Sequence, residues 1–65
     1  MELFLNGEPR QTRAADLAAL LTELGYAEQG VATAVNGRFV PRPERAAVCL
    51  APRDRVEILA PMQGG

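Results

Sequence analysis

One amphipathic helix in a chain of 65 residues restricts the possible folds more than any other feature of this sequence. Between Thr12 and Gly25, apolar residues fall at i, i+3, i+4 and i+7, which is one stripe on a helix: Leu17, Leu20, Leu21 and Leu24. Thr12 or a close neighbour is expected to cap the start, Asp16 suits the positive N-terminal end, and Gly25 suits the left-handed position after the last turn. A single helix must bury this stripe against a sheet, which predicts an α+β domain.

Two Asn-Gly dipeptides separate short apolar runs and predict hairpins. Asn-Gly favours the type I′ turn, whose twist matches that of a two-residue hairpin loop. Asn6-Gly7 would join strands at residues 2–5 and 8–12, and Asn36-Gly37 would join strands at 31–35 and 38–40. Pro9 marks the polar second strand as an edge strand, because proline cannot donate to a ladder.

The remaining segments complete a mixed sheet around the helix. Pro43 favours a short helical turn, and a short strand is expected at residues 48–50. The last strand, Arg55–Ala60, alternates between Val56, Ile58 and Ala60 on one face and Arg55, Glu57 and Leu59 on the other. If the first face packs on the helix, Leu59 points outward, as does Phe4 on the first strand. The last strand is expected beside the first in the centre of the sheet. The prediction is a β-grasp domain at residues 1–60.

A C-terminal tail is predicted at residues 61–65, ending in Gly64-Gly65. Pro61 ends the strand, and five extended residues reach at most about 17 Å. Glycine has no Cβ and lets the backbone pass close to other groups, so the pair suits threading of a carboxylate into another protein's active site. The alternative reading is a frayed end without function.

Composition narrows the function classes. The net charge of −1 gives no field for nucleic-acid binding, and the chain has neither histidine nor lysine. No apolar run approaches the roughly 20 residues of a membrane span. These features, with the single cysteine, predict a cytoplasmic protein that binds no metal or cofactor and is not an enzyme.

Cys49 is the only candidate nucleophile, and there is no histidine to activate it. In a short apolar strand it is interpreted as a small buried hydrophobe. A persulfide relay through Cys49 is the alternative.

Three segments together resemble the sulfur carrier protein of thiamine thiazole biosynthesis, a ubiquitin-like family: residues 35–42 (Val-Asn-Gly-Arg-Phe-Val-Pro-Arg), 54–58 (Asp-Arg-Val-Glu-Ile) and 62–65 (Met-Gln-Gly-Gly). The resemblance covers essentially the whole chain. Two positions depart from the family pattern. No aromatic residue stands near Arg45, and Arg53 precedes Asp54 where members often have glycine.

The resemblance implies a β-grasp fold and a carboxylate on Gly65 that is adenylated and converted to a thiocarboxylate, with Gly64, Gln63 and Met62 giving access. It implies three partners: an adenylating enzyme similar to ubiquitin-activating enzymes, a sulfur-donor enzyme, and thiazole synthase. ATP and magnesium would be supplied by the first of these. The free chain is expected to be a monomer.

Leu59 and Phe4 are the candidate residues for partner docking, because both are expected on the outer face of adjacent central strands. Either residue alone would need no explanation as an exposed apolar group. Three alternatives remain open for the function: a molybdopterin-type sulfur carrier, a protein-tagging modifier, and a β-grasp interaction module with an inert tail.

Overall fold

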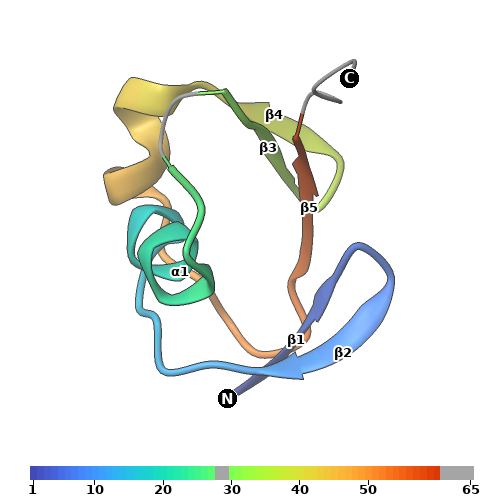
Figure 1. Ribbon diagram of the computed structural model, residues 1–65. Coiled ribbons are helices and arrows are strands. Elements are labelled where there is room, and N and C mark those ends of the chain that lie inside the picture. Colours follow the sequence, from blue (N-terminus) through green and yellow to red (C-terminus); the bar gives the residue numbers. More distant parts are fainter. Residues whose placement is uncertain (28–29, 61–65) are drawn as a thin grey trace.

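The computed structural model describes residues 1–27 and 30–60 and shows one mixed sheet with a helix and a short 3-10 helix against one side (Figure 1). The elements, in chain order, are β1 (Glu2–Leu5), β2 (Glu8–Gln11), α1 (Leu17–Leu24), β3 (Ala32–Val35), β4 (Arg38–Val40), η1 (Arg42–Ala47) and β5 (Arg55–Leu59). The expected tail at residues 61–65 lies outside the described residues.

The sheet has the strand order β2-β1-β5-β3-β4, so the last strand lies in its centre. β5 pairs in parallel with β1 (Phe4↔Arg55) and antiparallel with β3, where the register reaches Ala32↔Leu59. β1–β2 and β3–β4 are antiparallel hairpins. This arrangement confirms the predicted β-grasp fold, including the place of β5 beside β1 and of β2 at an edge.

Both hairpin turns have the geometry that Asn-Gly predicts. Asn6 and Gly7 have φ values of 50° and 85°, and Asn36 and Gly37 have 52° and 83°. Positive φ at both central residues is the requirement of a type I′ turn.

Helix α1 is shorter at its N-terminus than expected, because Asp16 caps it and Thr12 does not. The Asp16 carboxylate accepts a hydrogen bond from the Ala19 N–H at 2.8 Å, which satisfies a free donor of the first turn. The Thr12 hydroxyl is engaged elsewhere, since it accepts from the Ala14 N–H at 3.0 Å. Gly25 ends the helix in the left-handed conformation, as predicted.

The leucine stripe of α1 and the inner face of the sheet form the core. Leu17, Leu20 and Leu21 are buried, and Leu24 is partly buried against them. Their partners in the sheet, all buried, are Leu3, Val35, Val40, Val56 and Ile58. Ala60 was expected on this face, but it lies beyond the end of β5 and is exposed.

The predicted strand at residues 48–50 is absent, and an isolated bridge between Cys49 and Asp16 takes its place. The neighbouring backbone groups bind the segment before α1, through Leu17 N–H to Val48 C=O and Leu50 N–H to Ala15 C=O. Val48 and Leu50 point to the core, so alternation turns the side chain between them outward.

A buried arginine joins η1 to the sheet. Arg45 is 2% exposed, its Nε donates to the Thr33 hydroxyl at 3.1 Å, and its Nη2 donates to the Val31 carbonyl at 2.7 Å. The short helical turn predicted around Pro43 is therefore fixed to β3 by a side chain. Within the described residues, no helix is long and apolar enough to cross a membrane.

Candidate docking surface at the end of the last strand

The final strand, β5, lies in the centre of the sheet and leads toward the C-terminus, so a surface at its end lies next to the predicted tail. The four candidate site residues of the predicted tail, Met62, Gln63, Gly64 and Gly65, lie outside the described residues. The structure does place the two candidate docking residues, Leu59 and Phe4. Both lie on the face of the sheet away from α1, which we call the outer face. Its residues are Phe4, Ala32, Ala34, Phe39, Arg55, Glu57 and Leu59.

Leu59 is 73% exposed, although it lies in a central strand. Alternation explains this, because Val56 and Ile58 face the core and the residues between and after them face out. Leu59 is paired with Ala32 on β3, whose small side chain leaves it uncovered. An apolar side chain therefore projects from the last residue of β5.

A second large apolar side chain, Phe39 on β4, is 70% exposed on the same face. It lies opposite Ala34, which in turn lies opposite Glu57 on β5. The two alanines form a low floor between Phe39 and Leu59, and a hollow of about 260 Å³ lies over them. The outer face at this end is thus an apolar depression bounded by two exposed side chains.

Phe39 was missed as a candidate by the sequence reasoning, although a signal was present. Val40 had to face the core, and period-two alternation then turns Phe39 outward. The short length of the predicted strand hid this pattern.

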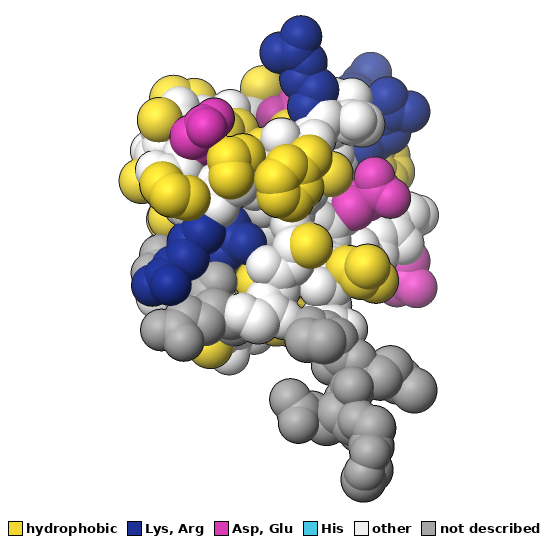
Figure 2. Space-filling view, turned by 90° about the horizontal axis from the view of Figure 1, so that it is seen from above, with side chains coloured by type: hydrophobic (Ala, Val, Ile, Leu, Met, Phe, Trp, Pro, Cys, Tyr) yellow, Lys and Arg dark blue, Asp and Glu magenta, His cyan; other side chains and the backbone are white. Residues whose placement is uncertain are grey.

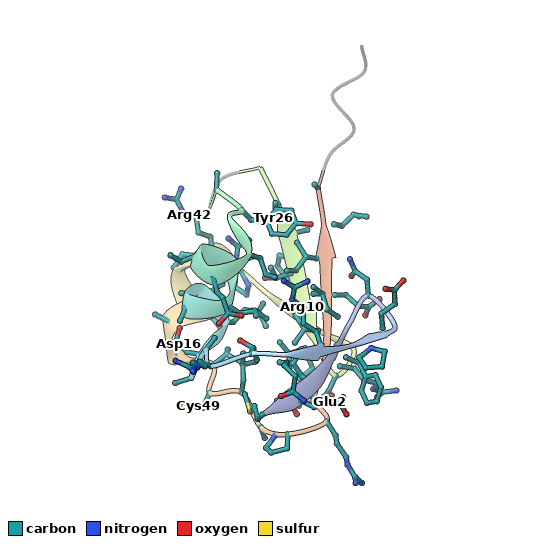
Figure 3. All side chains as sticks on the ribbon, turned by 60° about the horizontal axis from the view of Figure 1, so that its bottom comes forward. Glu2, Arg10, Asp16, Tyr26, Arg42 and Cys49 are labelled. Carbon is teal, nitrogen blue, oxygen red and sulfur yellow. The ribbon has the colours of Figure 1, made fainter. Side chains whose placement is uncertain are left out.

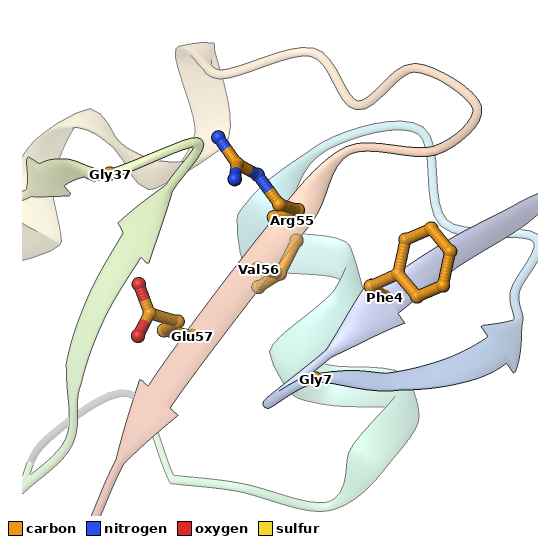
Figure 4. Close-up of a pocket in the computed structure, with 6 residues that line it drawn as sticks. All are labelled: Phe4, Gly7, Gly37, Arg55, Val56 and Glu57. Carbon is orange, nitrogen blue, oxygen red and sulfur yellow. The ribbon is translucent and has the colours of Figure 1, made fainter.

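Phe4 is half-buried on the outer face, so it is less accessible than Leu59. It lines a larger hollow of about 500 Å³ together with Arg55 and Glu57 on β5 (Figure 4). The two turn glycines, Gly7 and Gly37, lie on either side of this hollow. The structure therefore brings Phe4 and Leu59 to one face, in neighbouring hollows that share Glu57.

Charge on this part of the surface is mixed. Seen from above, hydrophobic side chains gather between groups of arginine side chains (Figure 2). On the outer face itself, Arg55 and Glu57 are exposed and precede Leu59 along β5. A partner would meet an apolar surface with one cation and one anion beside it.

Cys49 lies away from this surface, near Asp16 at the start of α1 (Figure 3). It is exposed, which overturns its interpretation as a buried hydrophobe. Among residues 1–27 and 30–60, no three histidine, cysteine or acidic side chains are grouped so as to hold a metal ion.

The chain is similar to known proteins over nearly its whole length. Residues 3–65 match the ThiS family. A crystal structure of the thiamine biosynthesis protein ThiS from Geobacter metallireducens is similar, with a TM-score of 0.82 and 32% identity over 100% of both chains. A solution NMR structure of a thiamine biosynthesis protein from the same organism has a TM-score of 0.84 and 32% identity, over 100% of this chain and 88% of the other. No curated protein matches the chain.

Proposed function

The chain belongs to the ThiS family of sulfur carriers, and from that premise we propose that it carries sulfur as a thiocarboxylate on Gly65 for the thiazole ring of thiamine. The observation that carries this proposal is the extent of the family match, which runs to residue 65 and includes the Gly-Gly end. The fold supports it, because the strand that precedes this end lies in the centre of a packed sheet.

The chemistry begins with a terminal carboxylate, which is ionised at neutral pH and is a poor electrophile. Attack of the Gly65 carboxylate on the α-phosphate of ATP would form an acyl-adenylate and release pyrophosphate. The terminal sulfur of a persulfide on a donor enzyme would then attack the acyl carbon and displace AMP, which leaves an acyl disulfide. A thiol of a partner enzyme would cleave the S–S bond of this adduct, forming a disulfide on the partner side and releasing Gly65 as the thiocarboxylate. The resulting thiocarboxylate sulfur is a better nucleophile than the original oxygen and can be delivered to thiazole synthase.

In this scheme the chain is a protein substrate and binds no cofactor of its own. ATP and magnesium would be bound by an adenylating enzyme similar to ubiquitin-activating enzymes. The chain would contribute position: Gly65 as the acceptor, and Gly64, Gln63 and Met62 as the passage into the partner's active site. The absence of histidine and lysine from the sequence is consistent with a substrate role.

Docking would use the outer face beside the end of β5. Leu59 and Phe39 expose about seven-tenths of their surfaces around a hollow, which suits an apolar side chain of a partner. Phe4 and Arg55 would extend the contact along the neighbouring hollow. Because this surface begins at the last residue of β5, a bound partner would lie next to the start of the tail.

Intact mass spectrometry tests the proposal. The purified chain, incubated with its adenylating enzyme, ATP, magnesium and a sulfur donor, should gain the mass that accompanies replacement of one oxygen by sulfur. Gly65→Ala should fold normally and gain no mass. Ala27→Gly, which exchanges the same two residue types in an exposed loop, should behave as the wild type.

Two results would contradict the proposal. Oxygen-to-sulfur exchange that continues in Gly65→Ala would show that sulfur transfer does not need glycine at the terminal position. A wild-type chain that binds the adenylating enzyme but never gains mass would instead be an interaction module. Supplying the product to thiazole synthase and, separately, to molybdopterin synthase identifies the pathway that uses the sulfur.

A further inference from the structure

The side chain of Asn6 binds the backbone of Ile58, near the end of β5. Its Oδ1 accepts a hydrogen bond from the Ile58 N–H at 2.9 Å, and its Nδ2 donates to the Ile58 carbonyl at 3.2 Å. We call these two hydrogen bonds the Asn6 clamp. They join residues 52 positions apart in the sequence.

The clamp extends the pairing of β1 with β5 past the point where β1 ends. The backbone ladder stops with the Asn6 N–H, which donates to the Val56 carbonyl at 2.9 Å. In a continuing parallel strand, the Asn6 carbonyl would accept from the Ile58 N–H. The turn at Gly7 carries that carbonyl away, and the side-chain amide takes its place. On its other side, β5 stays paired with β3 as far as Leu59. The clamp therefore holds both sides of β5 almost to its last residue.

The second hairpin turn makes a similar contact at the opposite end of the strand. Asn36 also has positive φ, and its Oδ1 accepts from the Arg55 N–H at 2.9 Å. Its Nδ2 donates to the Asp54 carboxylate at 3.0 Å. Two Asn-Gly turns thus bind the two ends of β5, and only the Asn6 contact lies next to the functional end.

From this asymmetry we infer that Asn6 is a positioning residue for sulfur transfer, because it fixes the point at which the chain leaves the sheet and the orientation of Leu59 beside it. The inference rests on the proposed function. Without the clamp, Ile58 loses its partners on the β1 side, and the residues that follow Leu59 start from a strand end that is held on one side only. A partner would then have to order this end when it binds.

Glycine is the substitution that isolates the clamp. It adopts positive φ without strain, so Asn6→Gly keeps the type I′ turn while it removes both side-chain hydrogen bonds. Asn36→Gly is the matched control, since it makes the same change in the same type of turn at the far end of β5.

Amide hydrogen exchange of the free chain measures the clamp directly. Successive N–H groups of a strand point to opposite sides, so the Glu57 N–H faces β3 while the Ile58 N–H faces Asn6. In Asn6→Gly, we expect exchange at Ile58 to accelerate about tenfold relative to exchange at Glu57, as for a lost pair of hydrogen bonds. In Asn36→Gly this ratio should stay at its wild-type value. A simple loss of global stability would accelerate both amides together.

Steady-state adenylation by the partner enzyme measures the consequence. Asn6→Gly should raise the KM for the carrier roughly three- to tenfold, because the partner must order the strand end, with a smaller change in kcat. Asn36→Gly should keep the wild-type KM. An unchanged Ile58-to-Glu57 exchange ratio, or a wild-type KM in Asn6→Gly, would overturn the inference. A wild-type chain that is not adenylated would overturn the proposed function and the positioning role together, and the exchange ratio would still show whether the clamp exists.

Discussion

The carboxylate of Glu23 on α1 accepts a hydrogen bond from the hydroxyl of Thr12, with 2.7 Å between the oxygens. Its other oxygen accepts from the Arg13 N–H at 3.2 Å. The segment that leaves β2 is thereby fastened to the exposed side of the helix. The hydrogen bond from Thr12, more than the one from Arg13 or the charges of Arg10 and Arg13, lowers the pKa of Glu23 below its ordinary value.

This contact predicts a pH-dependent contribution to stability. Because the pKa of Glu23 is lower in the folded chain than in the unfolded chain, the contribution is fully present above the ordinary pKa of glutamate. It is lost as the pH falls through the lowered folded pKa. Glu23 is exposed, so we expect a small effect. Urea unfolding at a series of pH values measures this contribution. At pH 7 the free energy of unfolding should be higher for the wild type than for Glu23→Gln, and the difference between the two should become smaller below about pH 4. A difference that stays constant across this range would contradict the assignment.

The positive φ of Arg53 predicts that its replacement by glycine stabilises the chain. The Asp54 N–H bonds back to the Ala51 carbonyl, and Pro52 and Arg53 are the two central residues of this turn. Arg53 has φ of 70°, in the third position of a type II turn, where glycine is strongly preferred. Arg53→Gly should raise the free energy of unfolding by up to about 1 kcal/mol, as measured by urea unfolding. Arg38→Gly in β4 serves as the control and should destabilise the chain. Equal losses in the two variants would show that the positive φ carries no strain.

Buried Arg45 predicts a large loss of stability on truncation. Its guanidinium bonds to the Thr33 hydroxyl and the Val31 carbonyl, and these groups would lose a charged donor inside the protein. Arg45→Met should lower the free energy of unfolding by roughly 2–4 kcal/mol. Exposed Arg38→Met should change it by less than about 0.5 kcal/mol. If Arg45→Met and Arg38→Met lowered the free energy of unfolding by similar amounts, the buried contacts of Arg45 would make no net contribution to stability.

The exposed position of Leu59 predicts that its substitution weakens partner binding but leaves the stability of the chain nearly unchanged. Leu59→Glu places a charge in the proposed contact but disturbs little of the core, since the side chain is 73% exposed. Binding to the adenylating enzyme should weaken at least tenfold by calorimetry, while the melting temperature changes by a few degrees or less. Phe39→Ala should act in the same direction. Ala19→Glu on the exposed side of α1 is the control and should bind normally. A large drop in melting temperature with unchanged binding would assign Leu59 to the core.

The exposed position of Cys49 predicts that its replacement changes neither stability nor function. Cys49 lies beside Asp16, which caps α1, and away from the outer face, so Cys49→Ser should keep both the stability and the yield of thiocarboxylate. Intact mass after a timed incubation measures the yield. Loss of sulfur transfer in this variant, with normal adenylation, would instead establish the persulfide relay through Cys49.

The features that follow from local chemistry could be predicted from the sequence. The stripe of Leu17, Leu20 and Leu21 indicated the helix and its buried side, and the Asn-Gly pairs indicated both turns. The alternation of Val56 and Ile58 with Leu59 correctly placed Leu59 outside. Strand periodicity alone was therefore enough to assign Leu59 and Phe4 to one face of the sheet.

Most features that were wrong or missed depend on contacts between distant residues. Thr12, the expected helix cap, instead donates its hydroxyl to Glu23 on α1, while Asp16, which caps the helix, forms a bridge with Cys49. Burial of Arg45 runs against the usual place of a charged side chain, and its hydrogen bonds to Thr33 and Val31 could not be read from the sequence. Phe39 belongs to a strand of three residues, which is too short to show a clear alternation.

The central place of β5 also governs how the chain must fold. β1 and β5 come from opposite ends of the sequence, and their pairing joins residues about fifty positions apart, such as Phe4 and Arg55. Closing a loop of this length costs conformational entropy. The hairpins and the helix, which depend on local contacts, can therefore form before β5 pairs with β1 and completes the core. A nascent chain interrupted before Arg55 would expose the leucines of α1 to water. Quality control in the cell could therefore remove incomplete carriers by their exposed apolar surface alone.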